Sequence, residues 1–319
     1  MHSLRRFQVA LLIATLMCSP AICEAQITLA LTKGFVKKYK DKATIATTFR
    51  VDKHHDEANP VGTGSDDGDI HIAGRDSVVL LPMVAEIVNG RRENDTLGFL
   101  LGTNAGQSVS LTGVWRFWFE HPGSEDQTQG KTVPKPTDTN PDHVFEFHPI
   151  VNFGGFDCLD SFLPIVNKVV NPTKEYRGYK ANIAFPAYED DSDNRLATIT
   201  RSNTAIMITA KKSGYNYTEF EMKLTGKPKD VGDGYLVFAN VYAVGADEPV
   251  MENTRRMVFA KGSPPADAVK NLKKGNTLHV VGIPRVNLNE VFAIASNLVG
   301  DEEFTGVLPY EMIIVAVLK

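Results

Sequence analysis

The chain is poor in cysteine, and this limits how it can be stabilised. Its 319 residues include three cysteines, and two of them, Cys18 and Cys23, lie in an N-terminal segment that we expect to be removed. Cys158 then has no partner for an internal disulfide and no companions for a cysteine-rich zinc site. We expect Cys158 to be a small buried apolar residue. The fold therefore depends on its core, for which 43% hydrophobic residues are sufficient.

The chain also has no long basic run. Its 34 Lys and Arg are outnumbered by 38 Asp and Glu, for a formal net charge of −4. Surfaces that bind nucleic-acid phosphates usually show clustered Lys and Arg on a basic domain, so nucleic acid is a less favoured partner. After the N-terminus, no apolar run is long enough to span a membrane.

The N-terminus itself has the pattern of an export signal. Arg5 and Arg6 precede the apolar run 9–17, and the small residues Cys23 and Ala25 fit a signal-peptidase site. We expect residues 1–25 to be a signal peptide and the protein to be exported, either periplasmic or secreted.

Two segments of the chain share one pattern. Residues 106–117 match residues 275–286 without a gap at an offset of 169. The matching pairs are Gly106 with Gly275, Gly113 with Gly282 and Arg116 with Arg285. A second match, between 144–150 and 310–316, follows less closely. We interpret the two halves as a tandem duplication.

Short segments rich in β-branched residues, bounded by turn residues, predict strands in both halves. Helices are expected near 96–101 and after Ser263, each before the fourth strand of its half. Five short strands with a helix before the fourth are typical of an OB-type barrel. The predicted fold class is mostly β with a few short helices, as two OB-like five-stranded barrels in tandem.

The expected domains follow from this pattern. They are the signal peptide 1–25, a first OB-like domain 26–155, a connecting helix and loop 156–204, and a second OB-like domain 205–319. The connector would open with a helix over 156–170, disturbed by Pro164. The polar, proline-rich segment 122–142 predicts a long loop that serves as a lid or binding loop, or is disordered. Segment 290–298 fits either helix or strand.

Histidine and carboxylate residues gather in the first half. In a strand, residues two apart share a face, so Asp69 lies with His71 and Glu146 with His148, while His121 follows the fourth strand. These five residues are the candidate metal ligands. Imidazole with carboxylate suits zinc or another divalent ion, which could activate water for hydrolysis. The alternatives are polar groups that line a wet barrel face, or a His–carboxylate general base without metal.

Aromatic residues crowd the fourth strand. Trp115, Phe117 and Phe119 share one face, and Trp118 lies on the other beside Arg116. We predict that Arg116 and Trp118 form an exposed ligand-binding platform, because aromatic residues on an OB face stack bases or sugar rings. The alternative is that the aromatic residues belong to the core.

Three elements occur here in a fixed order: Gly68-Asp-Ile-His71, the Thr-Gly-Val element 112–114, and Glu146-Phe-His-Pro149. This order resembles a group of uncharacterised exported bacterial proteins with an OB-like domain and a Gly-Asp-x-His … Thr-Gly-Val … Glu-x-His-Pro signature. The resemblance covers residues 43–153. It implies a small OB-like β domain outside the cytoplasm, and it brings no established activity.

Three functions remain open from the sequence. The first is an exported, non-enzymatic binding protein for a small ligand, such as a glycan. The second is a metal-dependent hydrolase with a His and Glu site in the first domain. The third is a structural or assembly module of the cell envelope, bound to an envelope protein. No cofactor is certain, and a divalent metal such as zinc is the candidate.

Overall fold

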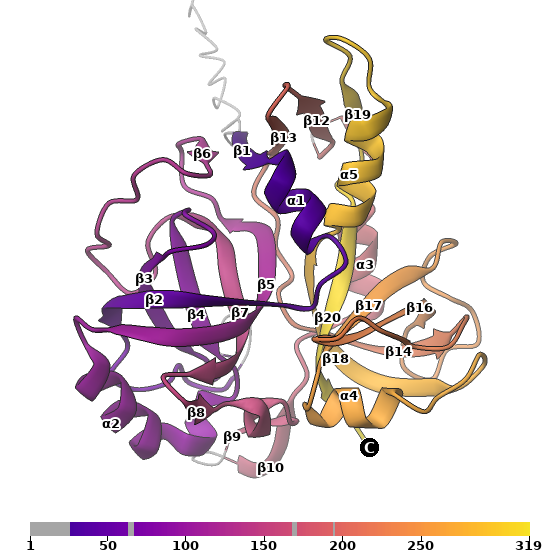
Figure 1. Cartoon of the computed structure of the whole chain (residues 1–319). Helices are drawn as coiled ribbons and strands as arrows, with labels where there is room; N and C mark the ends of the chain where they lie inside the picture. Colours follow the sequence, from indigo (N-terminus) through magenta and orange to yellow (C-terminus); the bar gives the residue numbers. More distant parts are fainter. Residues whose placement is uncertain (1–25, 63–66, 168–170, 194) are drawn as a thin grey trace, which may run out of the picture.

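The computed structural model describes residues 26–62, 67–167, 171–193 and 195–319, so the predicted signal peptide lies outside the described residues. Strands hold 44% of the residues and helices 17%, which confirms a mostly β protein. Within the described part of the chain, no helix is both long and apolar enough to cross a bilayer. Two closed five-stranded barrels stand side by side, and a smaller sheet lies above them (Figure 1).

The first barrel has the strand order β4-β3-β2-β5-β7 and is closed by a parallel pairing between β4 and β7. Its strands are β2 (Thr44–His54), β3 (Ile70–Asp76), β4 (Met83–Ile87), β5 (Ser108–His121) and β7 (His143–Phe153). The short helix η1 (Gly90–Glu93) and α2 (Asn94–Asn104) lie between the third and fourth strands, as predicted. This is the OB arrangement, in which the third and fifth strands close the barrel.

The second barrel repeats this topology strand for strand. Its strands are β14 (Thr218–Leu224), β16 (Gly234–Tyr242), β17 (Arg255–Ala260), β18 (Thr277–Val286) and β20 (Tyr310–Val317). A parallel β17–β20 pairing closes it, and α4 (Pro264–Val269) precedes the fourth strand. The side chain of Ser263 caps α4 by accepting a hydrogen bond from the Ala266 amide. The prediction of two OB-like barrels in tandem is confirmed.

The recurrent glycines of the two halves have a steric reason. A Cβ at Gly113 would lie 2.9 Å from Cβ of Phe147, and one at Gly282 would lie 3.0 Å from the Ile313 carbonyl. Both positions therefore require close approach between the fourth and fifth strands of their barrel, which glycine alone permits without a shift.

The two barrels contact one another through β5 and β18, and the contacts are reciprocal. Arg116 Nε donates to the Pro284 carbonyl at 2.9 Å, and Arg285 donates to the Trp115 carbonyl at 3.0 Å. Residues 115 and 116 are related to 284 and 285 by the same offset of 169 that relates the two segments in sequence. The interface thus has the reciprocal pattern of an isologous dimer contact.

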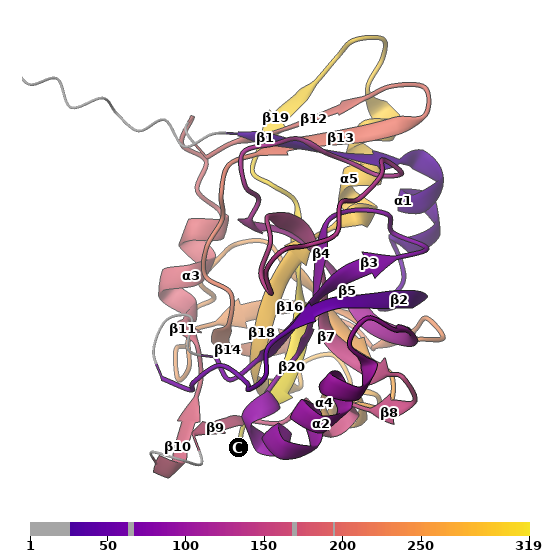
Figure 2. The same cartoon turned by 90° about the vertical axis from the view of Figure 1, so that its left-hand side faces the viewer.

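A third sheet covers one end of the molecule (Figure 2). Its order is β19-β12-β13-β1-β6, from β1 (Ile27–Thr32), β6 (Gln127–Thr128), β12 (Ala197–Arg201), β13 (Ala205–Ala210) and β19 (Phe304–Gly306). The expectation that 205–210 opens the second barrel is wrong, because β13 pairs with β1 and β12. The loop 122–142 supplies β6, which pairs in parallel with β1. Helices α1 (Lys33–Tyr39) and α5 (Leu288–Asn297) contact each other beneath this sheet. Segment 290–298 is thus helical as far as Asn297.

The connector contains several short elements. In order they are β8 (Phe156–Asp157), η2 (Leu159–Ser161), β9 (Ile165–Asn167), β10 (Asn171–Tyr176), β11 (Tyr179–Lys180) and α3 (Ala181–Tyr188). The prediction of a helix over 156–170 is therefore wrong for the residues of that range that the structure describes. Pro164 lacks an N–H and disfavours helical backbone at Leu163, so a single turn precedes it and a strand follows. The two-residue strand β15 (Lys229–Asp230) completes the second barrel's sheet.

Candidate metal centre

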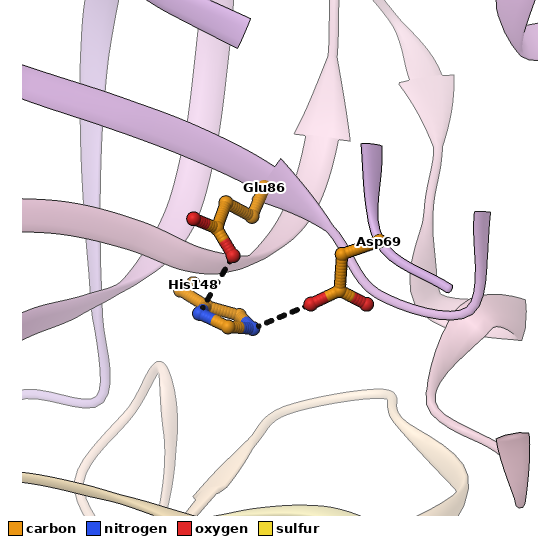
Figure 3. A group of neighbouring side chains, drawn as sticks. All are labelled: Asp69, Glu86 and His148. Carbon is orange, nitrogen blue, oxygen red and sulfur yellow. Dashed lines mark ion pairs between the residues drawn. The ribbon is translucent and has the colours of Figure 1, made fainter. Parts of the chain in front are cut away.

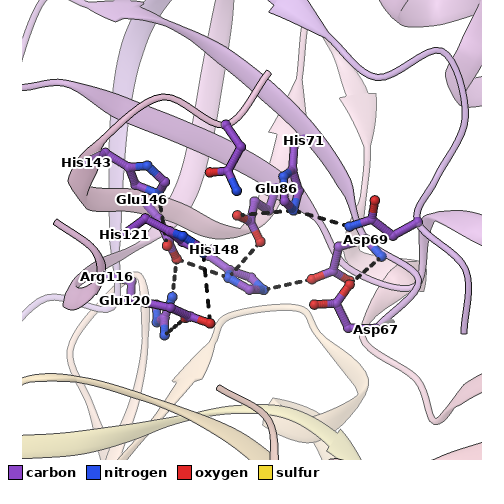
Figure 4. Close-up of polar contacts among 12 residues, drawn as sticks. Asp67, Asp69, His71, Glu86, Arg116, Glu120, His121, His143, Glu146 and His148 are labelled. Carbon is purple, nitrogen blue, oxygen red and sulfur yellow. Dashed lines mark hydrogen bonds and ion pairs between the residues drawn. The ribbon is translucent and has the colours of Figure 1, made fainter. Parts of the chain in front are cut away.

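A cluster of ionisable side chains lies on the outer face of the first barrel that the second half of the chain covers, and a pocket opens onto it. Strand alternation brings these groups together: His71 on β3 is paired directly with Glu86 on β4, and Glu146 and His148 share a face of β7. Asp69 immediately precedes β3. Figure 3 shows Asp69, Glu86 and His148, and Figure 4 shows the wider cluster with its hydrogen bonds and ion pairs.

His148 lies at the centre of the cluster and is fully buried. Its Nδ1 lies 3.0 Å from Glu86 Oε2 and 3.2 Å from Glu146 Oε2. Its Nε2 lies 3.1 Å from Asp69 Oδ2 and 2.9 Å from the Tyr217 hydroxyl, which itself donates to Asp69. Tyr217 directly precedes β14, so the second half of the chain helps to build this centre.

His143 is oriented in the way that metal-binding histidines usually are. Its Nδ1 lies 2.6 Å from the Pro141 carbonyl, and its Nε2 lies 3.1 Å from Glu146 Oε1. A carbonyl that accepts from one ring nitrogen fixes the tautomer and directs the lone pair of the other toward an ion. Here that other nitrogen points at the carboxylates.

Two groups of three side chains are close enough to hold an ion. One is Asp69, Glu86 and His148, and the other is Glu86, His143 and Glu146. Within each group, the potential ligand atoms lie within 4.8 Å of one another, and all the residues are buried. Glu86 belongs to both groups.

A pocket of about 480 Å³ opens onto this cluster. His71, Glu86 and Glu146 reach it, and Glu120 and His121 lie at its rim. Across from them, Tyr179 and residues 212–216 form the other wall. A separate pocket of about 580 Å³ lies along the loop 122–142, and no histidine lines it.

Burial and repulsion between neighbouring carboxylates shift the pKa values of the cluster. Burial, reinforced by neighbouring carboxylates, raises the pKa of both Glu86 and Asp67 well above the usual range. Burial alone would lower the pKa of His148, but Glu86 and Asp69 outweigh it and raise that pKa well above normal. The crowding of carboxylates, together with burial for Glu86 and Asp67, therefore favours the protonated forms of these three groups.

The pKa values of two other members of the cluster, Glu146 and His71, are lowered. Burial opposes ionisation of Glu146, but Arg116 and the two histidines hold its pKa well below the usual value. Burial and the neighbouring His55 lower the pKa of His71 to about 3. His71 is therefore neutral at physiological pH, which is the form that binds metals.

The second barrel is an internal comparison for the Arg116–Glu146 pair. Arg116 is paired with Glu146 across β5 and β7, and Arg285 is paired with Glu311 across β18 and β20. Glu146 thus corresponds to Glu311. Because the ion pair occurs in both barrels, we interpret it as part of their shared architecture.

Three other polar groups of the cluster, His71, Glu86 and His148, have apolar counterparts in the second barrel. His71 pairs with Glu86, whereas the equivalent pair in the second barrel is Leu236 with Val258. The same registers place Ile313, which pairs with Val258, where the first barrel has His148. The barrel therefore folds well with hydrophobic residues at these three positions, and the fold does not explain the buried His71, Glu86 and His148.

The sequence predicted five metal ligands, and the structure brings three of them, Asp69, Glu146 and His148, into one cluster. His71 adjoins it, with Nε2 3.5 Å from Glu86 Oε1. His121 lies at the rim, where its ring stacks on His143 at 5.5 Å between centroids.

Glu86, His143 and Tyr217 were not predicted as members of the site. Glu86 lies within the segment that the resemblance covers, but its role required knowledge of the β3–β4 register.

The predicted ligand platform of Arg116 and Trp118 is not exposed, and this expectation is wrong. Arg116 is fully buried between the two barrels, and Trp118 is 3% exposed. Trp118 packs edge-on against Tyr188 and donates to the Gly214 carbonyl at 3.4 Å. The fourth strand is covered on both faces because the second barrel packs against it.

Comparison with known proteins gave no relative. No protein-family model matches the chain, and a search of curated proteins found no match either.

Proposed function

We propose that this chain is an exported binding protein whose first barrel holds a divalent metal ion, with zinc as the first candidate. The ion would be held by Glu86, His143 and Glu146 and would anchor a ligand in the adjoining pocket. Two carboxylates and an imidazole form a donor set that suits zinc, and three protein ligands leave a position open for a ligand atom.

One observation carries this proposal. The first barrel buries His71, Glu86 and His148 where the second barrel has Leu236, Val258 and Ile313. Burying ionisable groups is costly, and replacing buried ion pairs by apolar residues is often neutral or stabilising. Buried groups with strongly shifted pKa values beside an open pocket are typical of functional sites.

The proposal is tested by loading the purified protein with zinc, removing free metal and measuring bound zinc by elemental analysis. Glu86→Gln keeps the size of the side chain but replaces a carboxylate with a poor ligand, so we expect it to lose zinc. His279→Ala is the matched control, because His279 pairs with Glu219 in the second barrel, at 2.8 Å and away from the cluster. Absence of zinc from the loaded wild-type protein would sink the metal proposal.

Export is tested separately. N-terminal sequencing of protein recovered outside the cytoplasm should begin near Gln26. A chain that retains residues 1–25 in the cytoplasmic fraction would contradict it.

A metal-dependent hydrolase is the second candidate, favoured by the open pocket over the candidate ligands. Glu86, His143 and Glu146 would hold the ion, which would supply an activated water at this pocket, and Glu120 or His121 at the rim would exchange protons with the substrate. Turnover of phosphodiesters or cell-wall polymers by the zinc-loaded wild type, lost in Glu86→Gln, would favour this function over simple binding.

A further inference from the structure

We propose that the cluster binds two divalent ions bridged by Glu86, and that its ligand is a phosphate-type oxyanion. This rests on the proposed metal function and extends it to a second ion and a ligand class. The second ion would lie at Asp69, Glu86 and His148.

The geometry of Glu86 supports a bridge. Its Oε1 faces His71 at 3.5 Å, and its Oε2 faces His148 at 3.0 Å. Its two oxygens thus contact different histidines, and the two groups of potential ligands share this residue alone. In two-metal sites the ions lie about 3.5–4 Å apart, a separation that one bridging carboxylate spans.

The charge of the cluster also suits bound cations. Four carboxylates, those of Asp67, Asp69, Glu86 and Glu146, are buried, and Arg116, which contacts Glu146, is the buried arginine beside them. Divalent ions would compensate the charge of buried carboxylates.

Unpartnered polar atoms at the pocket give independent support. His71 is 9% exposed and lines the pocket, and its Nδ1 has no hydrogen-bond partner among the described residues. The Nδ1 of His55, whose ring stacks on His71 at 4.7 Å, is likewise unsatisfied. Buried polar atoms are almost always paired, so their number here indicates that a bound group completes the site.

The ligand class follows from the pocket walls. Lys212, Asn59, Asn140 and Asn216 line the pocket, and their side chains supply hydrogen-bond donors. Donors together with a pair of cations recognise an oxyanion whose oxygens can bind both ions. The pocket of about 480 Å³ exceeds the size of phosphate, so phosphate would be the anchoring group of a larger molecule. The paired rings of Tyr179 and Tyr215, 4.9 Å apart, line the space for the remainder.

Metal stoichiometry tests the second ion. The chelator-treated full chain is titrated with zinc, and bound metal is measured after equilibrium dialysis. We expect two ions in the wild type and in His279→Ala, one in Asp69→Asn, and none in Glu86→Gln. The amide oxygen of the Asp69→Asn variant would still accept from the Tyr217 hydroxyl, which favours folding of this variant. One ion in both wild type and Asp69→Asn would overturn the second ion and leave the first, whereas no ion in the wild type would overturn both.

A second measurement does not depend on any variant. Wild-type protein loaded with manganese at one and at two equivalents is compared by electron paramagnetic resonance. A spin-coupled spectrum at two equivalents is expected of bridged ions. Two uncoupled manganese signals would overturn the Glu86 bridge.

The ligand class is tested by calorimetric titration with inorganic phosphate and, in parallel, with dimethyl phosphate as a diester probe. We expect at least one probe to bind about tenfold or more tightly at two zinc equivalents than at one, and Lys212→Ala to weaken that binding. Preference between the probes separates a free or monoester phosphate from a diester. Unchanged affinity for both probes would overturn the oxyanion assignment.

Discussion

Replacement of His148 tests how much its contacts with the carboxylates stabilise the protein. Replacing it alone by isoleucine, its counterpart in the second barrel, removes the imidazolium that contacts Asp69, Glu86 and Glu146. Breaking a buried charge pair on one side costs about 3–5 kcal/mol of unfolding free energy. For a chain of this size, about 2–4 °C of melting temperature accompanies each kcal/mol, so His148→Ile should melt roughly 6–20 °C lower without metal.

Adding the other two second-barrel residues should reverse this loss. In the triple variant His71→Leu, Glu86→Val, His148→Ile, the cluster loses Glu86 along with both histidines. Asp69 keeps the hydrogen bonds that it accepts from the Tyr217 hydroxyl and from the backbone N–H of Asn89. Replacing a buried ion pair by apolar residues raises the free energy of unfolding by about 1–4 kcal/mol. This gain offsets the cost of about 1–3 kcal/mol for leaving Asp69 without the His148 imidazole. The triple variant should therefore be at least as stable as the metal-free wild type.

The assay is thermal and urea unfolding of wild type, His148→Ile and the triple variant, each with chelator and with zinc. Zinc should stabilise the wild type and leave the triple variant unchanged, because a ligand stabilises only a state that binds it. If the triple variant melts as low as His148→Ile, the polar cluster is required for folding and the comparison between the barrels fails.

Three further predictions concern the buried ion pairs, Cys158 and the pH dependence of zinc binding. Arg116→Met should lower the free energy of unfolding in urea by about 3–5 kcal/mol, because it leaves the buried Glu146 without its arginine. Arg285→Met should cost less, because Arg256 still pairs with Glu311. A loss below about 1 kcal/mol for Arg116→Met would show that its pair with Glu146 is not structural. Burial raises the pKa of the Cys158 thiol to about 12, so a thiol reagent at pH 8 should react with it only in denaturant, and fast labelling of the native protein would contradict its burial. Burial raises the pKa of Glu86, and neighbouring carboxylates raise the pKa of His148 against the effect of burial. Zinc must therefore displace protons, and the affinity for zinc measured by calorimetry should rise from pH 6 to pH 8. An affinity for zinc that does not depend on pH would place the ion elsewhere.

Much of the fold was predictable because it depends on local pattern. Alternating β-branched segments indicated the strands, and Ser263 with the two prolines after it indicated α4. The repeated glycines and arginines at an offset of 169 indicated one topology used twice. The helix predicted over 156–170 failed because Pro164 interrupts it, and β13 was assigned to the wrong sheet because its partner β1 is far away in sequence.

The candidate site was predictable only in part. The i, i+2 spacing of Glu146 and His148 placed them on one face, since that relation belongs to a single strand. Arg116 and Trp118 looked like an exposed platform because nothing in the local sequence reveals that the second barrel covers β5. Glu86 could be placed beside His71 only once the register of β3 and β4 was known.

The sequence by itself determined the strands, the helices before each fourth strand, the duplication and the concentration of histidines in the first half. These features follow from side-chain periodicity and composition, which are local. The tertiary structure decided which of these groups meet. Tyr217 reaches Asp69 across 148 residues of chain, and His148 meets Glu86 only because parallel pairing of β4 and β7 closes the barrel. Such contacts depend on strand register and barrel closure, which arise when the whole domain buries its core.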